Sequence, residues 1–180
     1  MKQILILVLF VLICLSVGAV GSLYTAEAIP GWYVALTKPS LNPPAWLFGP
    51  VWTALYILMG ISIFLVWKNK WKVRNKFLVP KKKAWNKWSG KLWTGDWQKQ
   101  NLIAIFVIQL VLNALWSYIF FGRHQIGLAF FELVALWFAI LYTIINFYRV
   151  SKVSAALLIP YIFWVTFAAY LNYSVWILNR

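Results

Sequence analysis

The side chains in this sequence that could do chemistry are a few polar groups inside long apolar runs. Gln109, Asn113 and Ser117 recur every four residues, which places them on one face of a helix. Amide and hydroxyl groups in an apolar run must face protein, a ligand or water. Two interpretations follow: the three side chains hydrogen-bond neighbouring helices, or Asn113 and Ser117 orient a bound ligand.

Glu132 is the one acidic residue inside an apolar run long enough to cross a membrane. A carboxyl group at such a position is a candidate for pairing or for function, because an isolated charge in hydrocarbon is strongly unfavourable. A structural role, with a hydrogen bond to a neighbouring helix, fits this position. A role in proton relay or in ligand contact fits it as well.

The last apolar run, residues 153–179, contains no charged residue. In this run Trp164 is followed one helical turn later by the small Ala168, and Leu171 lies on the same stripe. A large ring beside a small residue leaves a notch suited to a flat apolar guest, so we interpret the stripe as one wall of a ligand pocket. The alternative is helix packing, in which small residues let backbones approach and Asn172 hydrogen-bonds a neighbouring helix.

The sequence offers no conventional catalytic or metal-binding constellation. Its single cysteine, Cys14, lies in an apolar run and suits the role of a small hydrophobic residue. Its single histidine, His124, lies in a short turn without the neighbours of a metal cluster, and haem ligation is the minor alternative there. The absence of a nucleophile with its base, a Walker loop or a metal cluster argues against a hydrolase, a kinase or a metalloenzyme. We therefore expect no bound metal and no required cofactor.

The composition predicts an integral membrane protein. The chain has 180 residues, of which 63% are hydrophobic and 11% are charged, and its mean hydropathy is +0.76. Cutting the sequence at its charged residues leaves five apolar runs that each hold the ~20 residues a membrane-spanning helix requires. We predict an all-α polytopic membrane protein, a single domain over 1–180 that forms a bundle of five transmembrane helices at about 4–26, 45–67, 101–121, 126–148 and 154–178.

The first run could be mistaken for a signal peptide, because Lys2 precedes an apolar stretch that ends in small residues. The run is longer than the apolar part of most signal peptides. We expect it to be a retained helix in which Gly18 and Ser22 form a small-residue packing face.

The stretch from Glu27 to Pro44 is expected to be irregular and to fold over one membrane face as a lid. It holds four prolines, which forbid one continuous helix. Trp32 and Tyr33 favour the membrane–water interface, where an amphipathic ring keeps its polar atom hydrated.

A basic insert, residues 68–100, separates the second and third predicted helices. It holds 11 of the 17 basic residues, interleaved with tryptophans. Nucleic-acid binding is one interpretation of such a mixture. We favour a segment that lies on anionic lipid headgroups and binds no nucleic acid, because a bilayer holds both of its ends. With five spanning helices, 14 basic residues fall on the side of the membrane that holds the amino terminus and three fall on the other side. We therefore predict a cytoplasmic amino terminus in a multi-pass protein of the cell membrane.

Placed together, these pieces resemble the TspO/MBR family, the group of tryptophan-rich sensory proteins, translocator proteins and peripheral benzodiazepine receptors. The resemblance covers essentially all of the chain except the basic insert. In the first half it rests on Trp32, Tyr33, Lys38, Pro39, Pro43, Pro44, Phe48, Trp52, Leu55 and Tyr56. In the second half it rests on Asn113, Trp116, Ser117, Phe120, Phe121, Gly127, Glu132, Leu158, Pro160, Tyr161, Trp164, Phe167, Ala168, Leu171 and Asn172.

The resemblance implies a five-helix bundle, usually a homodimer, that binds porphyrins and other flat lipophilic molecules in a pocket beneath the first loop. It implies that the ligand-binding residues are Tyr33, Pro43, Trp52, Asn113, Trp116, Ser117, Trp164, Ala168 and Leu171. In bacterial members the tryptophans that match Trp52 and Trp164 are implicated in light- and oxygen-dependent porphyrin breakdown. The same two indoles are therefore the catalytic hypothesis for this chain.

The expected function is that of a membrane receptor or carrier for porphyrins and haem-like tetrapyrroles, with light-dependent porphyrin degradation as an added activity. Two alternatives stay open. One is a transporter of a small amphipathic solute, in which Glu132 would titrate during transport. The other is a membrane scaffold or stress regulator that acts through the basic insert.

Overall fold

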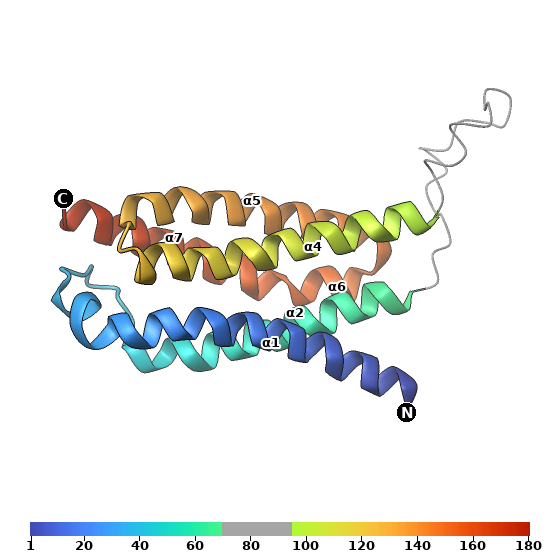
Figure 1. Ribbon diagram of the computed structural model, residues 1–180. Coiled ribbons are helices and arrows are strands. Elements are labelled where there is room, and N and C mark those ends of the chain that lie inside the picture. The colour runs from blue at the N-terminus through green and yellow to red at the C-terminus, as the bar shows by residue number, and fades with distance from the viewer. Residues whose placement is uncertain (70–94) are drawn as a thin grey trace, which may run out of the picture.

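The computed structural model describes residues 1–69 and 95–180, and this part of the chain is almost entirely helical (Figure 1). The prediction of an all-α membrane protein is confirmed, because the described part contains five helices long and apolar enough to cross a membrane and no strand. Most of the basic insert, including its expected contact with lipid headgroups, lies outside the described residues.

The expected helices lie within the helical elements of the structure. The bounds of these elements are Lys2–Ala28 for α1, Phe48–Lys68 for α2, Gly95–Ser117 for α4, Ile126–Val150 for α5, Lys152–Leu157 for α6 and Ile159–Leu178 for α7. A short 3₁₀ turn, Ala45–Leu47, leads into α2, and a π-helical turn, Tyr118–Gly122, closes α4.

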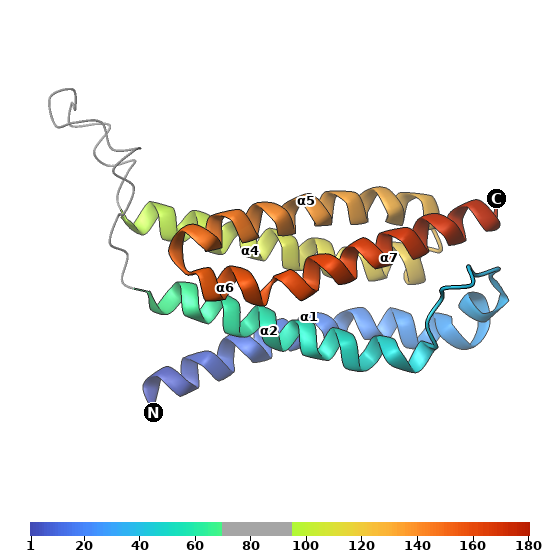
Figure 2. The same ribbon diagram turned by 180° about the vertical axis from the view of Figure 1, so that it is seen from behind.

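The fifth span is divided into α6 and α7 rather than forming the single helix expected. The break falls at Leu158, and Pro160 stands in the first turn of α7. A proline lacks the backbone N–H that a helix interior requires, but this N–H is not needed in a first turn. The chain therefore restarts the helix at the proline, and α7 runs at an angle to α6 (Figure 2).

The first span is longer than expected, because the chain stays helical past Pro30. The residues Ile29–Tyr33 form a π-helical turn, with Pro30 near its start, and only residues 34–44 make a non-regular loop for most of their length. We call residues 34–44 the lid loop. The irregular stretch predicted from Glu27 onward is thus shorter in the structure, since a π turn accommodates a residue without an N–H in its first turn.

The helices pack so that α1 lies against α2 and α4, and α5 lies against α4, α6 and α7. The two termini lie at opposite ends of the bundle, as an odd number of spans requires, and the lid loop shares the end of the carboxyl terminus (Figure 1). The core contains fully buried side chains from several helices, among them Met59 on α2, Leu136 on α5 and Val165 on α7, each at 0% exposure. In α1 only Cys14, Gly21 and Ala28 are buried.

Gly60 sets how closely α1 approaches α2. A Cβ added at Gly60 would lie 2.6 Å from Cα of Val11 and 2.9 Å from its backbone nitrogen. These are backbone atoms of a helix, which cannot move aside as the end of a side chain can. The two helices are therefore in contact at the backbone, and a glycine is required at this position.

We predict that Gly60→Ala lowers the free energy of unfolding by about 1–3 kcal/mol, because the added methyl group forces α1 and α2 apart. Thermal unfolding of the purified protein in detergent measures the change. Gly31→Ala is the matched control, since a Cβ at Gly31 would meet no atom within 4 Å. A Gly60→Ala protein as stable as the parent would show that the close approach is not important for stability.

Candidate functional site

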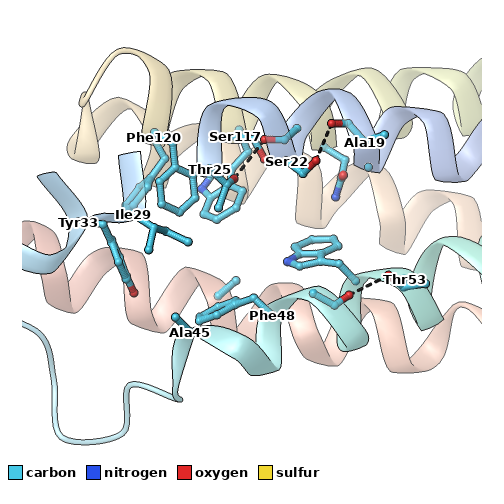
Figure 3. A pocket seen from close by; sticks show the side chains of 18 of the residues that line it. Ala19, Ser22, Thr25, Ile29, Tyr33, Ala45, Phe48, Thr53, Ser117 and Phe120 are labelled. Carbon is cyan, nitrogen blue, oxygen red and sulfur yellow. Dashed lines mark hydrogen bonds between the residues drawn. The ribbon is translucent and has the colours of Figure 1, made fainter. Parts of the chain in front are cut away.

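A cavity of about 360 Å³ lies at the lid end of the bundle, between α1, α2, α4 and α7 (Figure 3). Its walls are mostly apolar, aromatic or small. The lining residues are Leu15, Gly18, Ala19, Gly21, Ser22, Thr25, Ile29, Tyr33, Ala45, Phe48, Gly49, Trp52, Thr53, Tyr56, Asn113, Trp116, Ser117, Phe120, Phe121, Ala168, Leu171, Asn172 and Val175. None of these described lining residues belongs to α5 or α6, and α5 packs against α4 and α7, which do line the cavity.

Aromatic rings from α2 and α4 form a continuous row along the cavity. The ring centroids of Trp52 and Trp116 are 6.5 Å apart, with 29° between their planes. Tyr56 extends the row on one side at 5.8 Å from Trp52, and Phe120 extends it on the other at 5.5 Å from Trp116. The planes of neighbouring rings in this row are 28–30° apart, so the row offers a flat conjugated ligand several aromatic faces for stacking.

Asn113 joins three helices at the cavity wall. Its Oδ1 accepts a hydrogen bond from the Tyr56 hydroxyl on α2, and its Nδ2 donates to the Tyr161 hydroxyl on α7 over 3.0 Å. The Asn113 side chain is only 3% exposed. The interhelical interpretation of the polar ladder therefore describes what Asn113 does in the structure, although the residue also lines the cavity.

The indole of Trp116 is held in place by a second amide. Its Nε1 donates to Oδ1 of Asn172 over 3.1 Å, and Nδ2 of Asn172 donates to the backbone carbonyl of Ile126 over 2.8 Å. These two bonds connect α4, α7 and the first residue of α5. The orientation of the Trp116 ring toward the cavity is thus fixed by hydrogen bonds as well as by packing.

Small residues of α1 form the wall opposite α7. A Cβ at Gly18 would lie 2.3 Å from the Tyr56 ring, and one at Gly21 would lie 3.0 Å from Oγ of Ser117. Gly18 and Ser22, which the sequence assigned to helix packing alone, also line the cavity. Ser22 is labelled in Figure 3. The spacing of small residues in the first helix was the signal for this wall, but it does not distinguish packing from a ligand surface.

Tyr33, the last residue of the π-helical turn before the lid loop, lines the cavity, but Pro43 of the lid loop does not. The Tyr33 ring contacts Phe120 and Phe121, and its hydroxyl donates to Oδ1 of Asn42 over 3.0 Å. Nδ2 of Asn42 in turn donates to the carbonyl of Pro43 over 3.1 Å. Pro43 itself lies in the lid loop, two residues before Ala45, which does line the cavity.

Trp164 does not reach the cavity, unlike Ala168 and Leu171 on the same helix. Phe48 from α2 packs against the Trp164 ring at 5.9 Å between centroids, and Phe48 is the side chain that lines the cavity there. The notch predicted between Trp164 and Ala168 is thus filled from the Trp164 side by a residue of another helix. Seven of the nine predicted ligand-binding residues line the cavity, and whether they bind a ligand stays a prediction.

Glu132 and His124 lie away from the cavity. Glu132 is 8% exposed, and neither of its carboxyl oxygens has a hydrogen-bond partner among the described residues. The His124 ring stacks on Trp32, with centroids 4.2 Å apart and 15° between the planes. Within residues 1–69 and 95–180, no three His, Cys, Asp or Glu side chains come close enough together to hold a metal ion.

Comparison with known proteins gives one consistent result. The TspO/MBR family model matches residues 10–177. The chain is 40% identical over 178 residues to the tryptophan-rich protein TspO of Chlorobaculum tepidum, an alignment that covers 99% of this chain and 98% of that protein. It is 37% identical over 177 residues to the protein of the same name from Archaeoglobus fulgidus, with 98% and 99% covered. It is 36% identical over 157 residues to the human translocator protein, with 87% and 80% covered.

We predict that Tyr56→Phe lowers the free energy of unfolding by about 1 kcal/mol, since it removes one buried hydrogen bond between helices, and that Asn113→Ala lowers it by more, since it removes the bonds to both Tyr56 and Tyr161. The double variant should be destabilised by less than the sum of the two, because both substitutions remove the same Tyr56–Asn113 bond. Thermal or denaturant unfolding in detergent measures the free energies of unfolding of the parent, the two single variants and the double variant, which together form a double-mutant cycle. Strict additivity would mean that the two side chains do not interact.

Proposed function

Because this chain belongs to the TspO/MBR family of multi-pass membrane proteins, we propose that it is a receptor or carrier for porphyrins and other flat lipophilic molecules. The ligand would occupy the cavity beneath the lid loop. The observation that carries the proposal is the row of four rings, Tyr56, Trp52, Trp116 and Phe120, along a cavity of about 360 Å³. Cavities of this size, lined by aromatic side chains with a few polar groups, are typical of sites for small molecules.

The cavity is not fully enclosed, which suits a ligand with a large ring system. Its lining residues Ala19 and Ser22 on α1, and Gly49 and Thr53 on α2, are exposed on the outside of the bundle. A ring could stack on the aromatic row while its edge projects between these small residues toward lipid. Larger side chains at these four positions would close this opening of the cavity.

The charge near the cavity also fits a porphyrin that carries carboxylates. No charged side chain lines the described cavity. Lys38 of the lid loop lies with its Nζ 4.8 Å from the centre of the Tyr33 ring, and Tyr33 does line the cavity. A ligand whose apolar ring is inside and whose carboxylates point to the lid would pair its negative charge with this ammonium group.

The remaining parts of the proposal rest on the sequence. We propose a homodimer, as the resemblance to the family implies. We also propose a cytoplasmic amino terminus in the cell membrane, because 14 of the 17 basic residues fall on the side of the membrane that holds the amino terminus. The basic insert is proposed to contact anionic headgroups, where each basic residue near the surface contributes about 1 kcal/mol.

We predict that Ala168→Leu weakens protoporphyrin binding about tenfold or more, because the larger side chain occupies part of the cavity. Quenching of tryptophan fluorescence during titration of the purified protein in the dark measures the dissociation constant. Ala135→Leu is the control, since Ala135 is an exposed residue of α5, away from the cavity. Both variants should unfold at temperatures close to the parent. Unchanged binding by Ala168→Leu would place the ligand elsewhere.

We predict that Trp52→Phe removes most of any protein-dependent bleaching of protoporphyrin in light and oxygen, whereas Trp164→Phe removes less. Trp52 lines the cavity and would touch the ligand, but Phe48 separates Trp164 from it. The absorbance of bound protoporphyrin is followed under illumination, with each variant saturated with ligand. An equal loss in the two variants would contradict this placement, and no bleaching by the parent would leave a receptor or carrier without this activity.

A further inference from the structure

The lid loop is tied to the far end of the chain by one side chain. The backbone N–H of Thr37 donates to Oδ1 of Asn179 over 2.9 Å, and Nδ2 of Asn179 donates back to the carbonyl of Thr37 over 2.9 Å. The two residues are separated by 142 positions in the sequence. A carboxamide that accepts from the backbone N–H and donates to the backbone carbonyl of one residue holds the peptide groups on both sides of that residue, and so restrains its position and orientation.

The other hydrogen bonds of the lid loop are local. Asn42 accepts a hydrogen bond from the Tyr33 hydroxyl and donates to the Pro43 carbonyl. Nζ of Lys38 donates to the carbonyls of Val34 and Leu36, each over 3.1 Å. In the part of the chain that the structure describes, the other hydrogen bonds of residues 34–44 reach only the end of the first span and the Ala45–Leu47 turn, and the Thr37–Asn179 pair is the hydrogen-bonded link to the end of α7.

The same amide also reaches the cavity wall. The second hydrogen of Asn179 Nδ2 is directed to the carbonyl of Val175, 2.7 Å away, and Val175 lines the cavity. Arg180 lies over the Trp176 ring, with its Cζ 4.1 Å from the ring centre, which helps to hold the end of α7. Asn179 therefore joins the middle of the lid loop to a stable element of the wall.

The two ends of the lid loop are held independently of Asn179. At the amino end, Trp32 stacks on His124 and Tyr33 contacts Phe120. At the carboxyl end, the 3₁₀ turn Ala45–Leu47 leads directly into α2. Release of Thr37 would thus free the middle of the loop while its ends stay in place.

We propose that the Asn179 carboxamide is a latch that holds the lid loop closed and sets how fast a ligand enters and leaves the cavity. Asn179 does not line the cavity, so it is a positioning residue rather than a ligand contact. The part of this inference that concerns ligand exchange rests on the proposed function, but the latch itself can be measured without a ligand.

The first measurement is hydrogen–deuterium exchange of the parent protein, Asn179→Ala and Asn179→Asp in detergent. Asn179→Ala removes every hydrogen bond to Thr37, so amide exchange within residues 34–44 should become about tenfold faster. Asn179→Asp keeps an acceptor for the Thr37 N–H but cannot donate to its carbonyl, so its effect should be intermediate. Asn146→Ala is the matched control, because among the described residues Nδ2 of Asn146 donates to the Tyr142 carbonyl on its own helix and to no other helix.

The second measurement is the kinetics of protoporphyrin binding by stopped-flow fluorescence. If the latch controls access, Asn179→Ala raises the association and dissociation rate constants together, each by about tenfold, and leaves the dissociation constant nearly unchanged. A residue that merely supported the cavity wall would instead change the dissociation constant. Asn146→Ala should match the parent in both rate constants.

The outcomes separate this inference from the proposed function. Unchanged amide exchange in Asn179→Ala would overturn the latch, whatever the ligand. Faster amide exchange with unchanged porphyrin kinetics would overturn control of ligand exchange while leaving porphyrin binding intact. If the parent protein bound no protoporphyrin, the proposed function would fail, and amide exchange alone would decide whether Asn179 holds the lid.

Discussion

The hydrogen bonds of the Asn113 carboxamide are the interaction on which the cavity depends. Hydrocarbon supplies no hydrogen-bond partners, so a polar group inside a membrane-spanning bundle must find its partner within the protein. The hydroxyls of Tyr56 and Tyr161 converge on Asn113 from two other helices. This shared centre fixes α2, α4 and α7 relative to one another and holds Tyr56 at the end of the aromatic row.

Small residues then allow α1 to complete the enclosure. Gly60 brings the backbones of α1 and α2 into contact toward one end of the bundle, and Gly18 lets the Tyr56 ring lie against α1 nearer the lid. A helix that contributes so few buried residues is held by close approach rather than by large interlocking side chains. Because the residues of α1 that face the cavity are mostly small, space for the cavity remains between α1 and α7.

The two tryptophans singled out by the family resemblance do different things in the structure. Trp52 belongs to the aromatic row and lines the cavity, whereas Trp164 lies behind Phe48. Both were reasonable predictions, since each stands on an aromatic stripe of a spanning helix. The two tryptophans differ because Phe48, a side chain of α2, lies between Trp164 and the cavity. Their place in the family pattern therefore does not give them the same role. The distinction matters because light-driven chemistry would require contact between indole and ligand.

The sequence by itself determined the class of fold and much of the cavity. Long uncharged runs require spanning helices, because only a helix satisfies every backbone group in hydrocarbon, and the four-residue spacing of Asn113 and Ser117 places both on an inward face. Spacing along one helix also identified Ala168 and Leu171, since neighbours on a face share an environment. The tertiary structure alone decided that Phe48 covers Trp164, that Gly18 and Ser22 line a cavity, and that Asn179 holds Thr37. These contacts join helices and loops far apart in the chain, and periodicity within one helix carries no information about which residue of another helix it will meet.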